Sequence, residues 1–254
     1  MLSVFPAYKT EILLLAQLLI SWIVLFVCAY RYGKGGIYIY IVTSVILSNI
    51  QVLKFAQLFW TNEPVALGTT VFASTFLATD ILTEFYSTNS ARRSVTLGFL
   101  GFAFFSVLML LHVWIPPVSE DILIDKQLID GHTATAQLFL PLPSLYVSSI
   151  ISYFISERVD ISLYALLKKL TNGQALWFRS ITAATISAFI DTAIFSVLAW
   201  KLFAVHPISW PVLFFSYILG SFWPRIFISI TGVPILYLLK HYRHQWISHT
   251  RSDI

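Results

Sequence analysis

The chain has 254 residues, of which 57% are hydrophobic and only 11% are charged. Soluble domains carry about 25% charged residues, so this composition indicates an integral membrane protein with the lipid bilayer as a partner. The net charge of +4 is modest, which argues against nucleic acid as a partner, and the single cysteine, Cys28, can form no internal disulfide.

Seven apolar runs, each about as long as a membrane-spanning helix, follow one another along the chain. They cover residues 11–30, 37–60, 65–86, 94–115, 134–157, 177–200 and 210–239. Pro141 and Pro143 are expected to kink or break the fifth run near its start. Residues 158–173 alternate charged and apolar side chains at helical spacing, which predicts an amphipathic helix on the membrane surface that Gly173 closes. The expected fold is all-α: one domain, 1–254, forming a polytopic bundle of six to seven transmembrane helices with one short amphipathic surface helix.

Lysine and arginine gather on alternate connections between these runs. One side holds Arg31, Lys34, Arg92, Arg93, Arg158, Lys168, Lys169, Lys240, Arg243 and Arg251. The other side holds only Lys9, Lys126 and Lys201, together with Glu63, Glu120, Asp121, Asp125 and Asp130. Because cytoplasmic loops are enriched in Lys and Arg, this asymmetry predicts an N-terminus outside the cell and a cytoplasmic C-terminus.

The third run ends in two carboxylates, Asp80 and Glu84, whose spacing of four places them on one helical face. A carboxylate at membrane depth is costly without water, a proton or a cation, so such residues are usually functional. Asp80 lies roughly 22 Å from the start of its helix at 1.5 Å per residue, near the cytoplasmic end. Arg92 and Arg93, or a cation on another inner loop, are therefore better partners than Lys54, which is expected near the outer side. The alternative is a structural cluster that caps the basic inner surface.

Further polar residues fall inside other runs. Asp191 and Arg225 lie near the midplane of the sixth and seventh runs, which suggests an ion pair. The pair either fixes helix packing or lines a substrate cavity, and Pro224 favours the cavity because proline frees a backbone carbonyl. Asn49 is expected to face a neighbouring helix or a cavity, and Glu157 is expected at the membrane interface.

Deep aromatic residues are a further candidate feature. Phe222 and Trp223 are expected to pack in the core, with stacking on a planar ligand as the alternative. No nucleophile–base arrangement or metal-ligand cluster appears in the sequence, and no site for a cofactor, so we expect a protein that is not an enzyme.

The stretch ATDILTEFYSTNSARR (78–93) resembles the "TDLxxExYGxxxARR" signature of the queuosine precursor transporters, also called the vitamin uptake transporter family. Three further segments are similar to the same family: LSNIQVLKFA (47–56), LYVSSIISYFISERVDISLYALLKKL (145–170) and RSITAATISAFIDTAIFSVLAW (179–200). The resemblance covers about 44–240 and leaves 11–30 as an extra N-terminal helix. The chain departs from the family pattern at Ser87, where glycine is usual, at Ala188, where glutamine is usual, and at Arg225, where lysine is common.

The resemblance implies a multi-pass importer, in the bacterial inner membrane, of a 7-deazaguanine (preQ0, preQ1 or queuine) used in tRNA modification. The guanine-like edge of such a molecule offers N–H donors that a carboxylate can accept. The candidate substrate-binding residues are Asn49, Asp80, Glu84, Asp191 and Arg225, and the candidate ion-pair or gating residues are Lys54, Arg92, Arg93 and Glu157. The alternative is a substrate-capture membrane subunit whose uptake is energised by a separate ATPase. Oligomeric state and energy source are left open.

Overall fold

The computed structural model describes residues 9–56, 65–116, 126–139, 143–204 and 206–242. This part of the chain is helical apart from two-residue strands β1 (Phe55–Ala56) and β2 (Val65–Ala66), which pair antiparallel. The α-helices are α1 (Lys9–Gln51), α2 (Thr69–Phe85), α3 (Thr88–Trp114), α4 (Lys126–Phe139), α5 (Pro143–Leu170), α6 (Leu176–Val197), α7 (Trp210–Val212) and α8 (Gly220–His241). Two π-helical turns, η1 (Leu198–Leu202) and η2 (Leu213–Leu219), continue α6 and precede α8.

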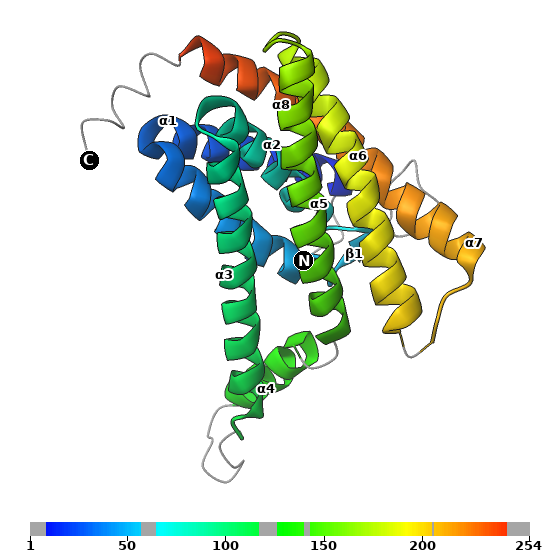
Figure 1. Cartoon of the computed structure of the whole chain (residues 1–254). Coiled ribbons are helices and arrows are strands. Elements are labelled where there is room, and N and C mark those ends of the chain that lie inside the picture. The colour runs from blue at the N-terminus through cyan, green and yellow to red at the C-terminus, as the bar shows by residue number, and fades with distance from the viewer. Residues whose placement is uncertain (1–8, 57–64, 117–125, 140–142, 205, 243–254) are drawn as a thin grey trace.

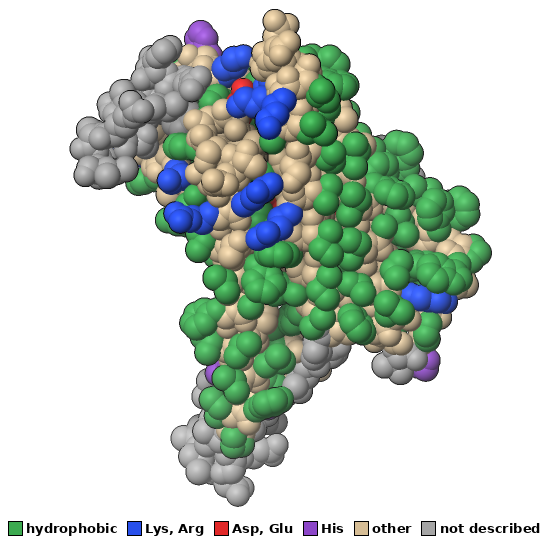
Figure 2. Space-filling view, viewed as in Figure 1, with side chains coloured by type: hydrophobic (Ala, Val, Ile, Leu, Met, Phe, Trp, Pro, Cys, Tyr) green, Lys and Arg blue, Asp and Glu red, His purple; other side chains and the backbone are tan. Residues whose placement is uncertain are grey.

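Four helices of the described chain are long and apolar enough to cross a membrane: 10–51, 88–114, 176–202 and 210–241. The bent pair α4–α5, whose axes differ by 51°, makes a fifth if it counts as one broken span. The predicted break near Pro141 and Pro143 is confirmed, because α4 ends at Phe139 and α5 begins at Pro143. The chain is therefore a multi-pass membrane helix bundle, with large hydrophobic side chains exposed over much of the face in Figure 2.

Helix α1 is broken within its length at Gly33, whose φ of 56° and ψ of −137° lie outside the helical region. The amides of Gln17 and Gln51 are joined by a hydrogen bond of 2.8 Å, although a straight helix would separate them by roughly 50 Å. The two halves of α1 therefore fold back on each other at the predicted basic turn. Gly36 allows the close approach, since a Cβ there would lie 2.3 Å from the carbonyl oxygen of Cys28.

Helix α2 lies at the centre of the bundle and contacts α1, α3, α5, α6 and α8. Nearly all of its side chains are buried, although it has only 17 residues. In Figure 1, α3, α5 and α6 stand side by side, and α8 crosses behind α5 and α6. The stretch with Asp80 and Glu84 is thus surrounded by protein on all sides, rather than facing lipid.

The predicted surface helix over 158–173 is wrong. Helix α5 continues without interruption to Leu170, and Gly173, with φ of 77°, then ends the helical segment as expected. The polar face that suggested a membrane surface packs instead against α2 and α6, where Asp160 and Tyr164 are fully buried. An amphipathic pattern does not distinguish a lipid surface from a polar neighbour, which is why the sequence misled.

Eight of the described Lys and Arg residues gather toward one end of the bundle, here called the basic end, beside the α2–α3 and α5–α6 connections and the end of α8: Arg31, Lys34, Arg92, Arg93, Arg158, Lys168, Lys169 and Lys240. Figure 2 shows Lys and Arg side chains concentrated over the upper part of that face. The tail cations Arg243 and Arg251 and the loop acids Glu63, Glu120, Asp121 and Asp125 lie outside the described residues.

Candidate functional site

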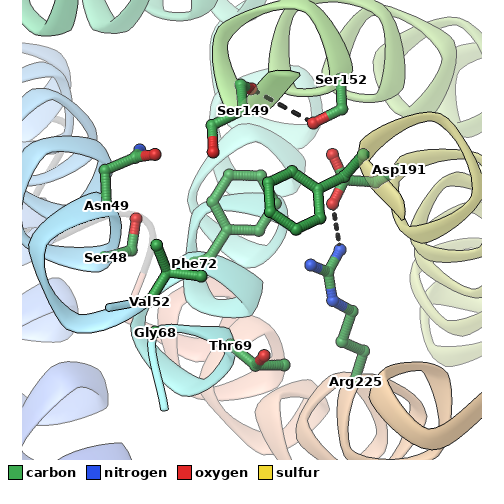
Figure 3. A pocket seen from close by; sticks show the side chains of 11 residues that line it. Ser48, Asn49, Val52, Gly68, Thr69, Phe72, Ser149, Ser152, Asp191 and Arg225 are labelled. Atoms are coloured by element: carbon green, nitrogen blue, oxygen red, sulfur yellow. Dashed lines mark hydrogen bonds and ion pairs between the residues drawn. The ribbon is translucent and has the colours of Figure 1, made fainter. Parts of the chain in front are cut away.

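A polar pocket, here called the central pocket, lies between α1, α2, α5, α6 and α8. Its lining residues are Ser48, Asn49, Val52, Gly68, Thr69, Phe72, Ser149, Ser152, Asp191, Phe195 and Arg225 (Figure 3). The volume of about 50 Å³ gives room for a few water molecules. Three of the residues expected to bind substrate, Asn49, Asp191 and Arg225, therefore lie together.

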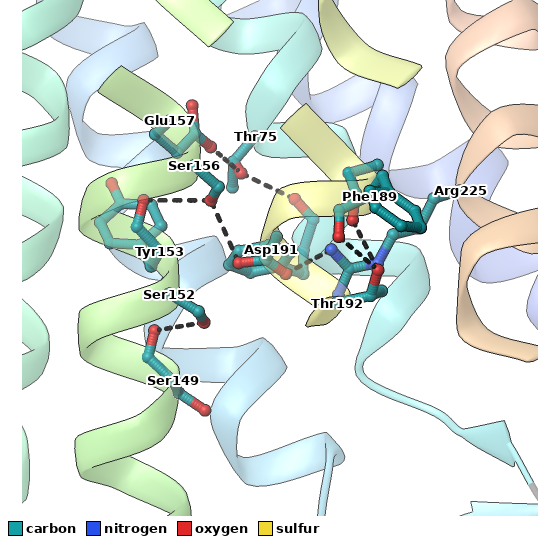
Figure 4. Close-up of polar contacts among 12 residues, drawn as sticks. Thr75, Ser149, Ser152, Tyr153, Ser156, Glu157, Phe189, Asp191, Thr192 and Arg225 are labelled. Atoms are coloured by element: carbon teal, nitrogen blue, oxygen red, sulfur yellow. Dashed lines mark hydrogen bonds and ion pairs between the residues drawn. The ribbon is translucent and has the colours of Figure 1, made fainter. Parts of the chain in front are cut away.

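Asp191 and Arg225 form the ion pair that the sequence suggested. Arg225 Nη1 donates to Asp191 Oδ2, and Ser156 Oγ donates to Asp191 Oδ1 at 3.1 Å (Figure 4). The exposed fractions are only 2% for Asp191 and 8% for Arg225. The Arg225 guanidinium also lies 5.0 Å from the centre of the Phe72 ring, a cation–π contact. The pair joins α6 to α8 and also lines the central pocket, and a substrate in this pocket stays a prediction.

Asn49 approaches the pocket from α1, on the other side of the Phe72 ring from Asp191 (Figure 3). Its Nδ2 donates to the Val45 carbonyl at 2.8 Å, which fixes the orientation of the amide. The start of α2 lies against α1 at this point because Gly68 has no side chain: a Cβ there would lie 2.3 Å from the Ser48 carbonyl oxygen.

The two aromatic residues considered for stacking on a planar ligand, Phe222 and Trp223, lie away from the central pocket. Trp223 is 63% exposed, and Phe222 packs edge-on against Phe189 with ring centres 5.6 Å apart. Neither lines the central pocket, whose aromatic residues are Phe72 and Phe195. The rotation of α8 places Arg225 inward and the preceding Trp223 outward, because residues two apart do not share a helical face.

A series of cavities leads from the central pocket toward the end of the bundle opposite the basic end. The next one, here called the middle cavity, also measures about 50 Å³ and shares Val52, Thr69, Phe195 and Arg225 with the pocket. It shares Phe55, Leu145 and Trp200 with a wide cavity of about 610 Å³. Trp200 lies between these spaces, with ring centres 5.4 Å from Tyr217 and 6.3 Å from Phe55.

The walls of this route include both π-helical turns. Trp200 belongs to η1, and Tyr217 belongs to η2. Single π-helical turns are often found at functional sites, because they shift the register of side chains along a helix. Here they place an aromatic contact between the wide cavity and the buried ion pair.

Glu157 lies on the other side of the central pocket, toward the basic end, and the expectation that it is interfacial is wrong. The side chain is fully buried. Thr75 Oγ1 donates to Oε1 at 2.5 Å (Figure 4), and Thr79 Oγ1 donates to Oε2 at 3.0 Å. Because α5 continues past the predicted membrane boundary, Glu157 sits in the middle of the helix and connects α5 to α2.

Asp80 and Glu84 are separate from the central pocket. Ser180 Oγ donates to Asp80 Oδ2, and Asp80 and Ser180 line a cavity of only about 10 Å³. Glu84 Oε2 accepts from Arg179 Nη2 at 3.0 Å, from Tyr164 at 3.1 Å, and from Lys168 Nζ at 3.0 Å. These contacts join α2, α5 and α6 near the basic end.

The cations proposed as partners take no part in the ion pairs of the described residues. Lys54, Arg92 and Arg93 are exposed, and the pairs use Lys168, Arg179 and Arg225 instead. The physical reason is the tight connection between α2 and α3: Ser87 caps α3 through a hydrogen bond of 3.1 Å from the Ser90 amide. The chain reverses there, and the first turn of α3 carries both arginines outward.

Sequence reasoning missed Arg179 and Asp160, both with no exposed surface. Arg179 is the first residue of the segment RSITAATISAF, and its position one turn into α6 was a usable signal. Asp160 shares a helical face with Glu157 and Tyr164, at spacings of three and four. That spacing was visible, but the surface-helix interpretation assigned the face to solvent.

Comparisons with known proteins give one family and one relative. The model of the family described as "Putative vitamin uptake transporter" matches residues 66–239. A Bacillus subtilis (strain 168) protein named "Probable queuosine precursor transporter" is 27% identical over 224 residues, which cover 87% of this chain and 91% of that protein. No solved structure matches the chain.

Proposed function

Because the chain belongs to the vitamin uptake transporter family, a family of transporters rather than enzymes, we propose that it imports a queuosine precursor, a 7-deazaguanine, across the bacterial inner membrane. The name of the Bacillus subtilis relative supports this substrate class. The observation that carries the proposal is the central pocket, which combines a buried carboxylate, an amide and an aromatic ring within reach of one small planar ligand.

The ligand is held by Asp191, Asn49 and Phe72. Asp191 accepts hydrogen bonds from the N–H groups of the guanine-like edge, which are strong when the acceptor is charged and the site is dry. The Asn49 amide donates to the ring carbonyl, and Phe72 offers its face for stacking. Arg225 supplies the buried counter-charge to Asp191. A pocket of about 50 Å³ is too small for a heterocycle, so binding requires α1 to move away from α6 and α8.

Seven spans fit the bundle if the two halves of α1 and the short buried helix α2 are each counted as spanning. The basic end then faces the cytoplasm, because cytoplasmic loops are rich in Lys and Arg. In this proposal the wide cavity opens toward the outside, and the basic end closes the inner side. Asp80, Glu84 and Glu157 then serve as the inner closure rather than as direct ligands of the substrate.

The test is queuosine in the tRNA of bacteria that neither make the precursors nor carry their own importer. Cells expressing this chain receive preQ0, preQ1 or queuine separately, with the downstream enzymes that each needs. Restored modification with one precursor is expected in the wild type and in Ser162→Ala, an exposed control, and is expected to fail in Asp191→Asn.

Two other outcomes would contradict the proposal. No restoration from any precursor, with the protein present in the membrane, would remove the 7-deazaguanine assignment. Restoration only in the presence of a separate ATPase module would replace the single-chain importer with a substrate-capture subunit.

A further inference from the structure

Four carboxylates gather between the central pocket and the basic end of the bundle. They are Asp80 and Glu84 on α2 and Glu157 and Asp160 on α5. Asp80, Glu157 and Asp160 are at most 1% exposed, and the Glu84 side chain is 11% exposed. The function proposed above does not use Asp160 at all.

Cations do not balance these acids. In the described chain only Arg179 and Lys168 pair with the group, and both pair with Glu84. Arg225 is already paired with Asp191 outside the group. Four carboxylates and two cations would leave two negative charges in a dry interior. A buried unpaired carboxylate is so unfavourable that it takes up a proton or a cation instead.

The hydrogen bonds show which of the four carboxylates lack a donor and therefore need a proton or a cation. Both oxygens of Glu157 accept from threonine hydroxyls, whereas in the described residues neither oxygen of Asp160 and not Oδ1 of Asp80 has a donor. The Ser187 hydroxyl on α6 is fully buried and close enough to Asp160 to interact with its carboxylate, although the geometry falls outside that of a formed hydrogen bond. Asp160 interacts electrostatically with Asp80 and Glu157, so the unpartnered oxygens lie in one region.

Protonation of Asp160 resolves this arrangement. A protonated carboxyl gains an O–H donor, which can serve Ser187 or the unpartnered Asp80 oxygen, and it removes one negative charge. A hard metal cation would need several converging oxygens. In the described chain no group of three or more His, Cys, Asp or Glu side chains is placed to hold a metal ion.

Polar groups lie between this region and the central pocket in the line Asp191–Ser156–Glu157. Ser156 donates to Asp191, and Glu157, the next residue on α5, interacts electrostatically with both Asp191 and Asp160. The titratable and charged groups around Asp160 are Asp80 and Glu84 on α2, Glu157, Tyr164 and Lys168 on α5, and Arg179 and Asp191 on α6, with Arg225 of α8 beyond Asp191.

We propose that Asp160, together with Asp80, is a proton-binding site that couples substrate import to inward proton movement. The inference rests on the proposed import function. A proton from outside passes the Asp191–Ser156–Glu157 line and binds Asp160. It leaves to the cytoplasm when the contacts around Glu84 and Arg179 open, so no other reactant is needed.

The test uses purified full-length protein in liposomes with tritiated preQ0, preQ1 and queuine tried in turn. Exchange of labelled for unlabelled compound at equal pH measures transport itself. Accumulation driven by an inside-alkaline gradient measures coupling, and one proton per substrate supports about tenfold accumulation per pH unit. We expect wild type to exchange and to accumulate, and a protonophore to abolish accumulation only.

Asp160→Asn is expected to keep exchange and to lose the gradient-driven accumulation. Asp160→Glu is expected to restore accumulation with a shifted pH profile, which a purely structural role would not produce. Ser162→Ala, an exposed position on the same helix, is the matched control and is expected to behave as wild type.

The outcomes separate the two claims. Full accumulation by Asp160→Asn, or accumulation driven by a sodium gradient and not by a proton gradient, would overturn proton coupling while leaving import intact. Loss of both exchange and accumulation in a folded Asp160→Asn would also overturn it, since Asp160 would then be needed for translocation itself. Absence of exchange by the wild type with all three compounds would overturn the import function and the coupling with it.

Discussion

The two halves of the bundle differ in how tightly their helices are joined. Toward the basic end, carboxylates tie α2 to α5 and α6 through Glu84, Glu157 and Asp80, and the cavity there measures only about 10 Å³. Toward the opposite end, the series of cavities reaches about 610 Å³ and the contacts around Trp200 are aromatic. The basic half is therefore joined by ion pairs and hydrogen bonds, whereas the contacts around the cavities of the other half are aromatic.

This difference suggests how a transporter of this kind would alternate. Alternating access requires that one side open while the other closes around a fixed site. The Asp191–Arg225 pair lies at the boundary between the two halves, in contact with the cavities on one side and with Ser156 on the other. Substitutions in each half and at the boundary therefore test whether the basic half is the more tightly joined one.

The largest effect is expected at the boundary. Asp191→Asn alone leaves Arg225 buried without a counter-charge, and we expect a loss of about 3–5 kcal/mol in the free energy of unfolding. Arg225→Gln is expected to be similarly harmful. In the double variant the loss should shrink markedly, because no unpaired charge remains, whereas substrate uptake should stay absent. Thermal unfolding in detergent together with uptake measures both, and additive losses of stability would show that the two side chains do not act as a pair.

The next largest effect is expected when one of the two cations that share Glu84 Oε2 is removed, and the two cations are expected to differ. Arg179→Met removes a partner with no exposed surface, and we expect a loss of about 3 kcal/mol because Glu84 loses its buried counter-charge. Lys168→Met removes a side chain that is 34% exposed, and we expect a loss of at most about 1 kcal/mol. Equal losses in denaturant or thermal unfolding would mean that burial does not decide the strength of the closure.

A smaller effect is expected where Glu157 meets α2. Thr75→Val or Thr79→Val removes one hydroxyl at nearly constant volume, and we expect a loss of about 1.5–3 kcal/mol because the acceptor is a buried carboxyl group. Ser152→Ala is the control outside the basic half, at the central pocket, since among the described residues its hydroxyl bonds only to a carbonyl of its own helix at 3.2 Å. A loss in Ser152→Ala as large as in the threonine variants would contradict a tighter basic half.

The smallest effect is expected where the backbone of α2 lies close to that of α1, at Gly68. Gly68→Ala places a Cβ against the Ser48 carbonyl, and overpacking of this kind costs about 1–3 kcal/mol. Gly220 has helical backbone angles and nothing within 4 Å of its Cβ position, so Gly220→Ala is expected to stabilise by up to about 1 kcal/mol. Changes of the same sign in both variants, measured by melting temperature, would remove the role of Gly68 in joining α2 to α1.

Much of the framework was predictable from residues alone. The break at Pro141 and Pro143 and the turn containing Gly33 follow from local backbone chemistry, and the Asp191–Arg225 pair follows from depth in two neighbouring spans. These features depend on position along a helix, which hydropathy gives directly.

The rest depends on rotation about helix axes and on which helices are neighbours, and neither is encoded locally. Asp160 and Glu157 were assigned to a surface because a polar face looks the same whether it meets water or another polar face. Arg179, rather than Arg92 or Arg93, pairs with Glu84 because α6 packs beside α2, a contact between residues 95 positions apart. The separation of Asp80 from Asp191 likewise required the packed structure.

Binding of tritiated preQ0, preQ1 and queuine to the purified protein tests most directly whether the substrate lies in the central pocket. The account predicts saturable binding of one of these compounds by the wild type, loss of that binding in Asn49→Ala, and unchanged binding in Ser180→Ala, which alters only the closure near the basic end. Retention of binding in a folded Asn49→Ala with loss in Ser180→Ala would contradict it and would move the site to Asp80.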